Sequence, residues 1–390
     1  MKYNFDEIIP RLGTNCFKYD GASMMGKPAD AIPMWVADMD FPTPPEVTEK
    51  IMAAARRSIY GYDLISSDYV AAVINWLADN FDFRPKSECL SISPGVVFAV
   101  ANAIRSQTAP GDAVLIQEPV YHPFSKLIKN NNRRLINNGL IYKDGRYSLD
   151  LADFEKKIVD ERVKLFILCS PHNPVGRVWT RDELAAMGDI CLKHKCLVVS
   201  DEIHCDFVRP GHQHHVFAAL SPEFAANSII CTAPSKTSNL AGLQASNIFI
   251  PNKEVRDKFV GEMNNAGYSG LNSMALVACQ AAYEHGRAWL DQLKEYLESN
   301  LTLLKNAVAD LPGAKVVEPE GTYLAWLDFN GLGLSLEALD DLITNRAKLW
   351  LDEGPKFGHG GEGFYRMNLA CPKGILERAL EQLRRAMESL

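Results

Sequence analysis

The feature that most constrains the fold is a series of short apolar segments that alternate with helical patterns between residues 90 and 251. Six segments are predicted to be strands: LSIS (90–93), AVLIQ (113–117), KLFILCS (164–170), CLVVSDE (196–202), SIICTAP (228–234) and SNIFIP (246–251). Apolar residues occupy successive positions in these segments, so both faces of each strand are expected to be buried. Buried strands that alternate with helices indicate a mostly parallel sheet covered by helices on both faces.

Helical patterns separate these strands. The spacing of apolar residues predicts helices over 96–107 and 180–194, and it places 154–162 within a third. Thr180, followed three residues later by Glu183, has the spacing of a capping box at a helix start. The chain therefore has the order of elements of an α/β protein.

The pattern changes near residue 270. A long helical region is predicted over 274–311, and a terminal helix over 376–387. Three strand-like segments lie between them: GTYLAWLDF (321–329), KLWLDEG (348–354) and FYRMNLAC (364–371). We therefore predict a large domain over residues 46–285 and a smaller α+β domain formed by 1–45 together with 286–390.

Composition excludes several classes of function. The net charge of −7 argues against nucleic acid as a partner, because binding to phosphates requires a basic surface. Nine cysteines without a CxxC pair indicate reduced thiols rather than a disulfide framework. The N-terminus lacks the apolar core of a signal peptide, and no apolar run approaches the length of a membrane span. We therefore expect a soluble cytoplasmic protein without a membrane partner.

One lysine has unusual neighbours. Lys236 lies in SIICTAPSKTSNLAGL (228–243), a stretch without acidic residues in which apolar and hydroxyl-bearing residues flank the lysine. A lysine that loses solvation becomes nucleophilic toward a carbonyl group, and this would allow a Schiff base. The alternative is a structural or solvated lysine, because most lysines keep their ammonium in water.

Further chemical groups follow other predicted strands. Ligands of open parallel sheets bind beyond the carboxyl ends of the strands. SPGVV (93–97) offers a glycine and the amides of a helix N-terminus to a phosphate, although Pro-Gly before a helix is common. Asn173 follows the third strand, where the alternative is an ordinary turn asparagine, and Asp201 ends the fourth. Pyridoxal phosphate (PLP) requires a phosphate-binding turn, an amide donor, an acid for its ring nitrogen and a lysine for its aldehyde. SPGVV, Asn173, Asp201 and Lys236 would supply these groups.

Eight stretches carry a family resemblance, in order from residue 34 to 372: MWVADMDF, GY, SPGVV, QEPVYHPF, CSPHNPVGRVW, DEIHCD, APSKTSNLAGL and GFYRMNLACP. With these motifs the chain resembles the PLP enzymes of fold type I, in the class I/II aminotransferase superfamily. Within that superfamily it resembles the cystathionine β-lyase (C–S lyase) branch. The resemblance covers nearly the whole chain. It implies a seven-stranded, mostly parallel sheet in the large domain and PLP as the cofactor.

The resemblance also implies three catalytic residues. Lys236 is implied to carry the cofactor as a Schiff base and to transfer protons. Asp201 is implied to pair with the pyridinium nitrogen, so that the ring can delocalise a carbanion. Tyr121 is implied to stack on the cofactor ring, where the alternative is a core tyrosine.

Other contacts are implied in the same way. Cofactor contacts are implied for the amides of Gly95, Val96 and Val97, the hydroxyls of Thr232 and Ser235, and the side chains of Asn173 and His204. Tyr62 is implied to reach the cofactor phosphate of the neighbouring subunit, which makes a homodimer the expected assembly. Arg366 is implied to bind the substrate α-carboxylate, with Ala37 and Asn173 also contacting the substrate. Without the resemblance, a surface arginine beside a strand is the better interpretation of Arg366.

Two residues differ from common patterns of the superfamily. His204 stands where many aminotransferases have a tyrosine, and histidine is typical of the lyase branch. Ser238 replaces a bulky aromatic residue, which predicts a wider pocket near the lysine. Two other motifs are expected to have no function. The GxGxxG in 357–364 precedes a strand-like segment, which argues against a dinucleotide site, and GHQHH (211–215) matches no zinc pattern and suggests an exposed loop.

These observations predict a β-lyase that acts on a small amino-acid substrate, a cysteine S-conjugate such as cystathionine. The products are expected to be a thiol, pyruvate and ammonia. An aminotransferase that uses the same lysine, aspartate and arginine is the main alternative, and only the branch resemblance separates the two. A cofactor-bound regulatory protein is a third alternative. No metal site is predicted.

Overall fold

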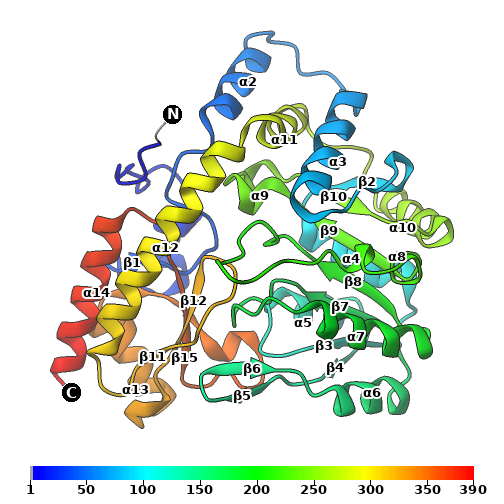
Figure 1. Ribbon diagram of the computed structural model, residues 1–390. Coiled ribbons are helices and arrows are strands. Elements are labelled where there is room, and N and C mark those ends of the chain that lie inside the picture. Colours follow the sequence, from blue (N-terminus) through cyan, green and yellow to red (C-terminus); the bar gives the residue numbers. More distant parts are fainter. Residues whose placement is uncertain (1–2) are drawn as a thin grey trace.

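The computed structural model describes residues 3–390, and its largest element is a seven-stranded sheet (Figure 1). The strand order is β2–β10–β9–β8–β7–β3–β4. The strands are β2 (Leu90–Ser93), β3 (Ala113–Ile116), β4 (Arg134–Asn137), β7 (Val163–Cys169), β8 (Leu197–Asp201), β9 (Ser228–Thr232) and β10 (Ser246–Phe249). The pairs from β9 to β4 are parallel, and only β10 is antiparallel to both of its neighbours. The predicted α/β fold with a mostly parallel sheet is confirmed.

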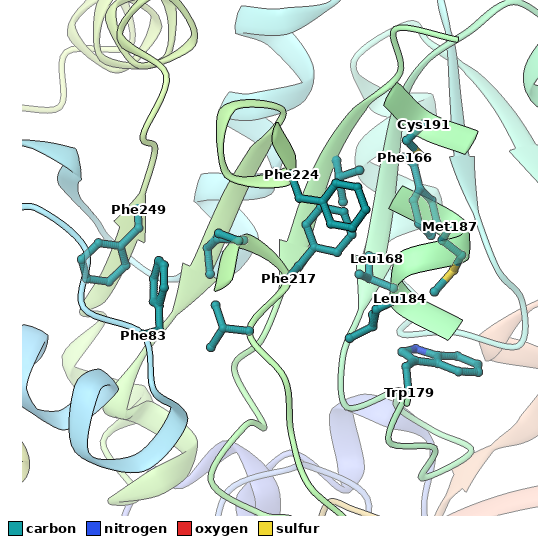
Figure 2. Close-up of a cluster of buried hydrophobic side chains, with 14 of the residues drawn as sticks. Phe83, Phe166, Leu168, Trp179, Leu184, Met187, Cys191, Phe217, Phe224 and Phe249 are labelled. Atoms are coloured by element: carbon teal, nitrogen blue, oxygen red, sulfur yellow. The ribbon is translucent and has the colours of Figure 1, made fainter. Parts of the chain in front are cut away.

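Helices cover both faces of this sheet. Alternate side chains of a strand therefore pack into two different hydrophobic cores, one on each face. In β7, Phe166 and Leu168 belong to one core, and Leu165 and Ile167 belong to the other. The first core packs against α3 (Ser67–Phe81), α6 (Leu151–Asp160), α7 (Arg181–Lys193) and α11 (Ser273–His285). The second packs against α4 (Val96–Gln107), α5 (Pro123–Asn130) and α10 (Lys253–Asn265). Figure 2 shows the first core, where the rings of Phe217 and Phe224 stack with centroids 5.2 Å apart.

The sequence signals at helix starts act as expected. Thr180 caps α7 and forms the predicted capping box with Glu183. Gly95 precedes α4 with φ +99°, a conformation that favours glycine. Short helices complete this part of the chain: α2 (Pro45–Ala55), α8 (Pro222–Ala226) and α9 (Pro234–Thr237).

The predicted helical region over 274–311 consists of two helices. α11 ends at His285 and α12 (Arg287–Ala309) follows directly, with Gly286 between them. A Cβ on Gly286 would lie 2.4 Å from the carbonyl oxygen of Ala282, so a larger residue would not fit at this junction. The region therefore turns at one glycine instead of continuing as one rod.

The remaining part of the chain forms a smaller layer. A four-stranded sheet has the order β11–β12–β15–β14. Its strands are β11 (Lys315–Val316), β12 (Leu324–Asp328), β14 (Asp352–Glu353) and β15 (Phe364–Asn368). It packs with α12, α13 (Leu336–Asp340) and α14 (Lys373–Glu388), and α12 and α14 lie side by side (Figure 1).

Two smaller pairings complete the fold. β1 (Ile32–Pro33) is parallel to β13 (Leu349–Trp350), so the N-terminal segment lies against the C-terminal part. β5 (Ile141–Lys143) and β6 (Arg146–Ser148) form a hairpin, and α1 (Phe17–Asp20) lies in the N-terminal segment. The exact domain division at residues 46 and 286 stays a prediction. Within residues 3–390, every helix is too short or too polar to cross a membrane.

Candidate active site

A cavity of about 410 Å³ lies at the carboxyl ends of the central strands. Its lining brings together most of the residues that the sequence singled out. They are Ala37, Gly95, Val96, Val97, Tyr121, Asn173, Asp201, His204, Ser235, Lys236 and Arg366. These residues come from both ends of the chain and from the middle, so the fold assembles the cavity from distant segments.

Lys236 is held by the short helix α9, directly after strand β9. Its Nζ donates to the carbonyl oxygen of Ala37 at 2.7 Å, and Tyr323 donates its hydroxyl to the same oxygen at 2.9 Å. Burial lowers the pKa of Lys236 to about 8, and the charge of Arg366 acts in the same direction. Thr237 anchors α9 by donating to buried Asp206 at 2.5 Å. The amine is thus fixed in place and more easily deprotonated than an ordinary lysine.

Asp201 ends strand β8 and is buried. Its Oδ1 accepts the backbone N–H of Ile203 at 3.1 Å, and within residues 3–390 the carboxyl group forms no ion pair. The pKa of Asp201 is raised to about 7, mainly by burial, and the charge of the neighbouring Glu202 acts in the same direction. A carboxyl group without a cationic partner can accept a hydrogen bond from a protonated nitrogen of a ligand.

The N-terminus of α4 offers backbone donors at another wall of the cavity. The first amides of any helix lack intrahelical acceptors, and here they belong to Val96 and Val97. A Cβ built on Gly95 would meet nothing within 4 Å, so open space adjoins this backbone. Ser235 lines the same cavity. These features form a site that fits an anion such as a phosphate.

Arg366 lies on β15 and is buried. Its Nη2 donates to Asp352 Oδ2 at 2.7 Å and to the carbonyl oxygen of Trp35 at 2.7 Å. Its Nη1 donates to Asn173 Oδ1 at 3.0 Å, whereas its buried Nε has no partner among the described residues. The guanidinium group is therefore oriented by three of its five N–H groups, and its Nε–H remains free for a carboxylate.

His204 and Tyr121 add polar groups whose protonation is set by burial. Burial lowers the pKa of His204 well below its ordinary value, and its Nδ1 has no partner within residues 3–390. Burial raises the pKa of Tyr121 to about 12, so its hydroxyl stays protonated near neutral pH. The Tyr121 ring is packed edge-on against Phe124, with centroids 5.6 Å apart. The His204 ring packs edge-on against Tyr323, with centroids 5.7 Å apart.

The structure does not bring two of the predicted residues to the cavity. Thr232 is buried, and its hydroxyl donates to the carbonyl oxygen of Asn247 on β10 at 2.9 Å, which gives no support to a phosphate contact. Tyr62 lies in the segment between α2 and α3 with a fully exposed side chain. Its predicted role requires a second subunit.

Three other expectations can be compared with the structure. Ser238 is buried outside the cavity lining, so it does not widen the pocket. The GxGxxG segment leads into β15 and no helix follows it. The expected exposed loop at GHQHH is wrong for His214, which is buried and bonded to Glu202 at 3.0 Å.

Sequence reasoning missed several residues of the cavity, among them Phe17, Trp35, His122, Cys169 and Asp352. Trp35 belongs to the quoted motif MWVADMDF, but no role was assigned to it. Asp352 lies in KLWLDEG beside a second acid, Glu353, so no local signal distinguishes it. Phe17 carries no such signal, because its position depends on how the N-terminal segment packs.

The large sheet and the cavity at its carboxyl edge define the architecture called fold type I. The family model for aminotransferase class I and II matches residues 29–383, and the chain belongs to this family. It is similar to cystathionine beta-lyase PatB of Bacillus subtilis (strain 168), with 43% identity over 98% of this chain and 100% of the relative.

Two solved structures are also similar. Cystalysin from Treponema denticola has 36% identity and a TM-score of 0.96, with 100% of both chains covered. A C–S lyase from Staphylococcus hominis has 34% identity and a TM-score of 0.93, covering 99% of this chain and 98% of the other. Both of those structures contain PLP.

Proposed function

We propose that this protein is a PLP-dependent carbon–sulfur β-lyase of the cystathionine β-lyase type. It acts on cysteine S-conjugates and releases a thiol, pyruvate and ammonia. Support comes from 43% identity to cystathionine beta-lyase PatB and from the similarity to cystalysin and to a C–S lyase. The single observation that carries the proposal is the buried amine of Lys236 in one cavity with the carboxyl group of Asp201, which forms no ion pair within residues 3–390.

The groups that line the cavity fit PLP. Asp201 has no cationic partner in the described part of the chain and suits a protonated ring nitrogen, and the first amides of α4 after Gly95 suit a phosphate. The buried Lys236 suits an aldehyde, and the unpartnered Nδ1 of His204 offers one more polar contact. We assign the cofactor contacts to Gly95, Val96, Val97, Tyr121, Asn173, Asp201, His204, Ser235 and Lys236.

Bound PLP supplies the electron sink that stabilises a carbanion at the substrate α-carbon. The chain supplies the remaining groups. Arg366 binds the α-carboxylate with its free Nε, and Lys236 accepts the α-proton at Nζ, which its lowered pKa favours. The Cβ–S bond then breaks and its electron pair leaves on sulfur. Water converts the released aminoacrylate into pyruvate and ammonia.

The test is an assay of pyruvate with L-cystathionine and PLP-loaded protein, without any 2-oxo acid. Pyruvate in large molar excess over the protein is the expected result, and it is the result of a lyase. Amino-group transfer that proceeds only after a 2-oxo acid is added would make the protein an aminotransferase. Absence of both reactions would contradict the proposal and favour a non-catalytic role.

We further propose that the protein is a homodimer in which Tyr62 of one protomer reaches the cofactor phosphate of its partner. Tyr62 is exposed together with the apolar side chains of Ile59, Tyr60 and Leu64. Exposed apolar residues in such number suit an interface between subunits. Light scattering is expected to give twice the mass of the chain. The variant Tyr62→Phe should weaken PLP binding by about tenfold, the effect of one lost hydrogen bond to a charged group.

We also propose a cytoplasmic location. All nine cysteines are free, and eight of them are buried. Buried free thiols are typical of proteins in a reducing compartment.

A further inference from the structure

One carboxylate oxygen in the cavity has no function in the reaction described above. Asp352 lies on β14, and its side chain is only 5% exposed although it lines the cavity. Its Oδ2 accepts from Arg366 at 2.7 Å. Its Oδ1 has no hydrogen-bond donor among residues 3–390, and Lys356 Nζ lies 3.7 Å away. This oxygen is an acceptor that remains available.

Lys356 forms a long ion pair with this oxygen but no hydrogen bond. Its side chain is 37% exposed, and its Nζ lies closer to another acid, Glu353, at 3.3 Å. Lys356 also does not line the cavity, whereas Asp352 does. The side of Asp352 that faces the cavity is therefore open to a ligand.

A second acceptor lies in the same cavity. His122 follows Tyr121, and within residues 3–390 neither of its ring nitrogens is hydrogen-bonded. Burial lowers the pKa of His122, so the ring is neutral near neutral pH and one nitrogen is an acceptor. The ring of Phe357 lies near both groups. Its centroid is 5.9 Å from the centroid of the His122 ring and 4.9 Å from Cζ of Arg366, the partner of Asp352.

We propose that Asp352 and His122 form a subsite for an ammonium group on the leaving half of the substrate. The inference rests on the proposed β-lyase function and names its substrate class, which is cysteine S-conjugates with a cationic group beyond the sulfur. An ammonium group has only donors, and the subsite consists of a carboxylate oxygen and a neutral imidazole nitrogen. Arg366 is already assigned to the α-carboxylate, so Asp352 recognises a different part of the substrate.

The charges at the cavity wall favour this class over the alternatives. A neutral S-alkyl group would leave Asp352 Oδ1 without a partner in a partly desolvated position, which is unfavourable. An anionic group beside Asp352 Oδ1 would be repelled by that carboxylate, and both Nη atoms of Arg366 already donate to Asp352, Asn173 and Trp35. The subsite therefore selects by charge and not by size.

The test uses PLP-loaded protein and three substrates of similar size. S-(2-aminoethyl)-L-cysteine carries an ammonium group, S-propyl-L-cysteine is neutral, and S-carboxymethyl-L-cysteine is anionic. Initial rates of pyruvate release give kcat/KM for each. Each variant is compared by the ratio of two substrates relative to wild type, so that the different acidities of the leaving thiols cancel.

In Asp352→Asn, the amide oxygen can still accept from Arg366, while its NH₂ group faces the cavity as a donor. The ratio of the aminoethyl to the propyl substrate should fall at least about tenfold, the value of one lost charge-assisted hydrogen bond. The ratio of the carboxymethyl to the propyl substrate should rise. A loss of Arg366 orientation would lower all three rates alike and would leave these ratios unchanged, so the ratios isolate the subsite.

Two further variants complete the design. His122→Phe keeps a ring but removes the acceptor, and it should lower the aminoethyl ratio by about threefold. Glu362→Gln removes the same charge from an exposed side chain just before β15, which lies outside the cavity lining, and should leave the ratio within about twofold. Unchanged ratios in Asp352→Asn with normal pyruvate release would overturn the subsite alone. Absence of pyruvate from every substrate in wild type would instead overturn the proposed function.

Discussion

Two clusters of buried charge adjoin the loop that carries Asn173, and they differ in how completely their groups are paired. In the first, Arg177 is 1% exposed and donates to Glu320 at 2.7 Å, to Glu183 at 2.9 Å and to the carbonyl oxygen of Tyr147. Glu320 also accepts the backbone N–H of Val178 at 2.9 Å. These bonds lower the pKa of Glu320 despite its burial, so its charge is retained.

In the second cluster, at the active site, the pairing is incomplete. Arg366 Nε and His204 Nδ1 have no partners within residues 3–390, and burial moves the pKa values of Asp201 and Lys236 toward neutrality. A buried group without partners costs free energy that a bound ligand can recover. Complete pairing therefore marks the charges that hold the chain together, and incomplete pairing marks those that bind and react.

The largest expected effect comes from removing the central group of the active site. Lys236→Ala should lower pyruvate release by about 10⁴-fold or more, the upper range for loss of a general base. Because the buried amine forms no ion pair with any of residues 3–390, the PLP-free variant should be at least as stable as wild type. Urea unfolding beside the activity assay checks both statements. An inactive variant that is also markedly less stable would break the distinction between the clusters.

The next effect concerns the completely paired cluster. Glu320→Gln should lower the free energy of unfolding by about 3 kcal/mol, because it removes the buried carboxylate of Arg177 and leaves only the more exposed Glu183 to balance its charge. The matched control is Glu318→Gln, two residues away, whose carboxylate is 63% exposed and pairs with Lys305. This control should cost less than about 1 kcal/mol. An equal decrease in the free energy of unfolding in the two variants would show that the buried, fully paired cluster does not stabilise the fold more than an exposed ion pair.

The smallest effect is a dependence on pH. The folded pKa of Asp201 is about 7, above the value of about 3.9 in an unfolded chain. The ionised group therefore destabilises the PLP-free fold, fully above pH 7 and not at all below about pH 4. Asp201→Asn should stabilise the PLP-free protein more at pH 8 than at pH 5, by about 2–3 kcal/mol. Urea unfolding at both values measures this difference, and a gain independent of pH would contradict it.

Local patterns in the sequence predicted much of the fold. The bounds of β2 and α4 and the capping box of α7 were predicted correctly, because they depend on apolar spacing and on residues within a few positions. The half-exposed strand β4 and the antiparallel direction of β10 were not predicted. Both depend on pairing with distant strands, which apolar spacing does not encode.

The same limit applies to the active site. Residues at strand ends, such as Asn173, Asp201 and Lys236, reach the cavity because parallel strands end at one edge. The direction in which a hydroxyl group points could not be predicted: Thr232 also ends a strand, but its hydroxyl donates to the neighbouring strand β10. Asp352 was missed because its importance arises from Arg366, 14 positions away on another strand.

The parallel pairing of β1 with β13 has a consequence for how the protein matures during synthesis. Ile32 pairs with Leu349, and the carbonyl oxygen of Trp35 accepts from Arg366, 331 residues later. Ala37, which holds the lysine amine, lies in this same N-terminal segment. The segment leaves the ribosome first but finds its place only when the final tenth of the chain has been translated. The active-site cavity of a nascent chain is therefore incomplete, and the protein becomes able to catalyse its reaction only late in folding.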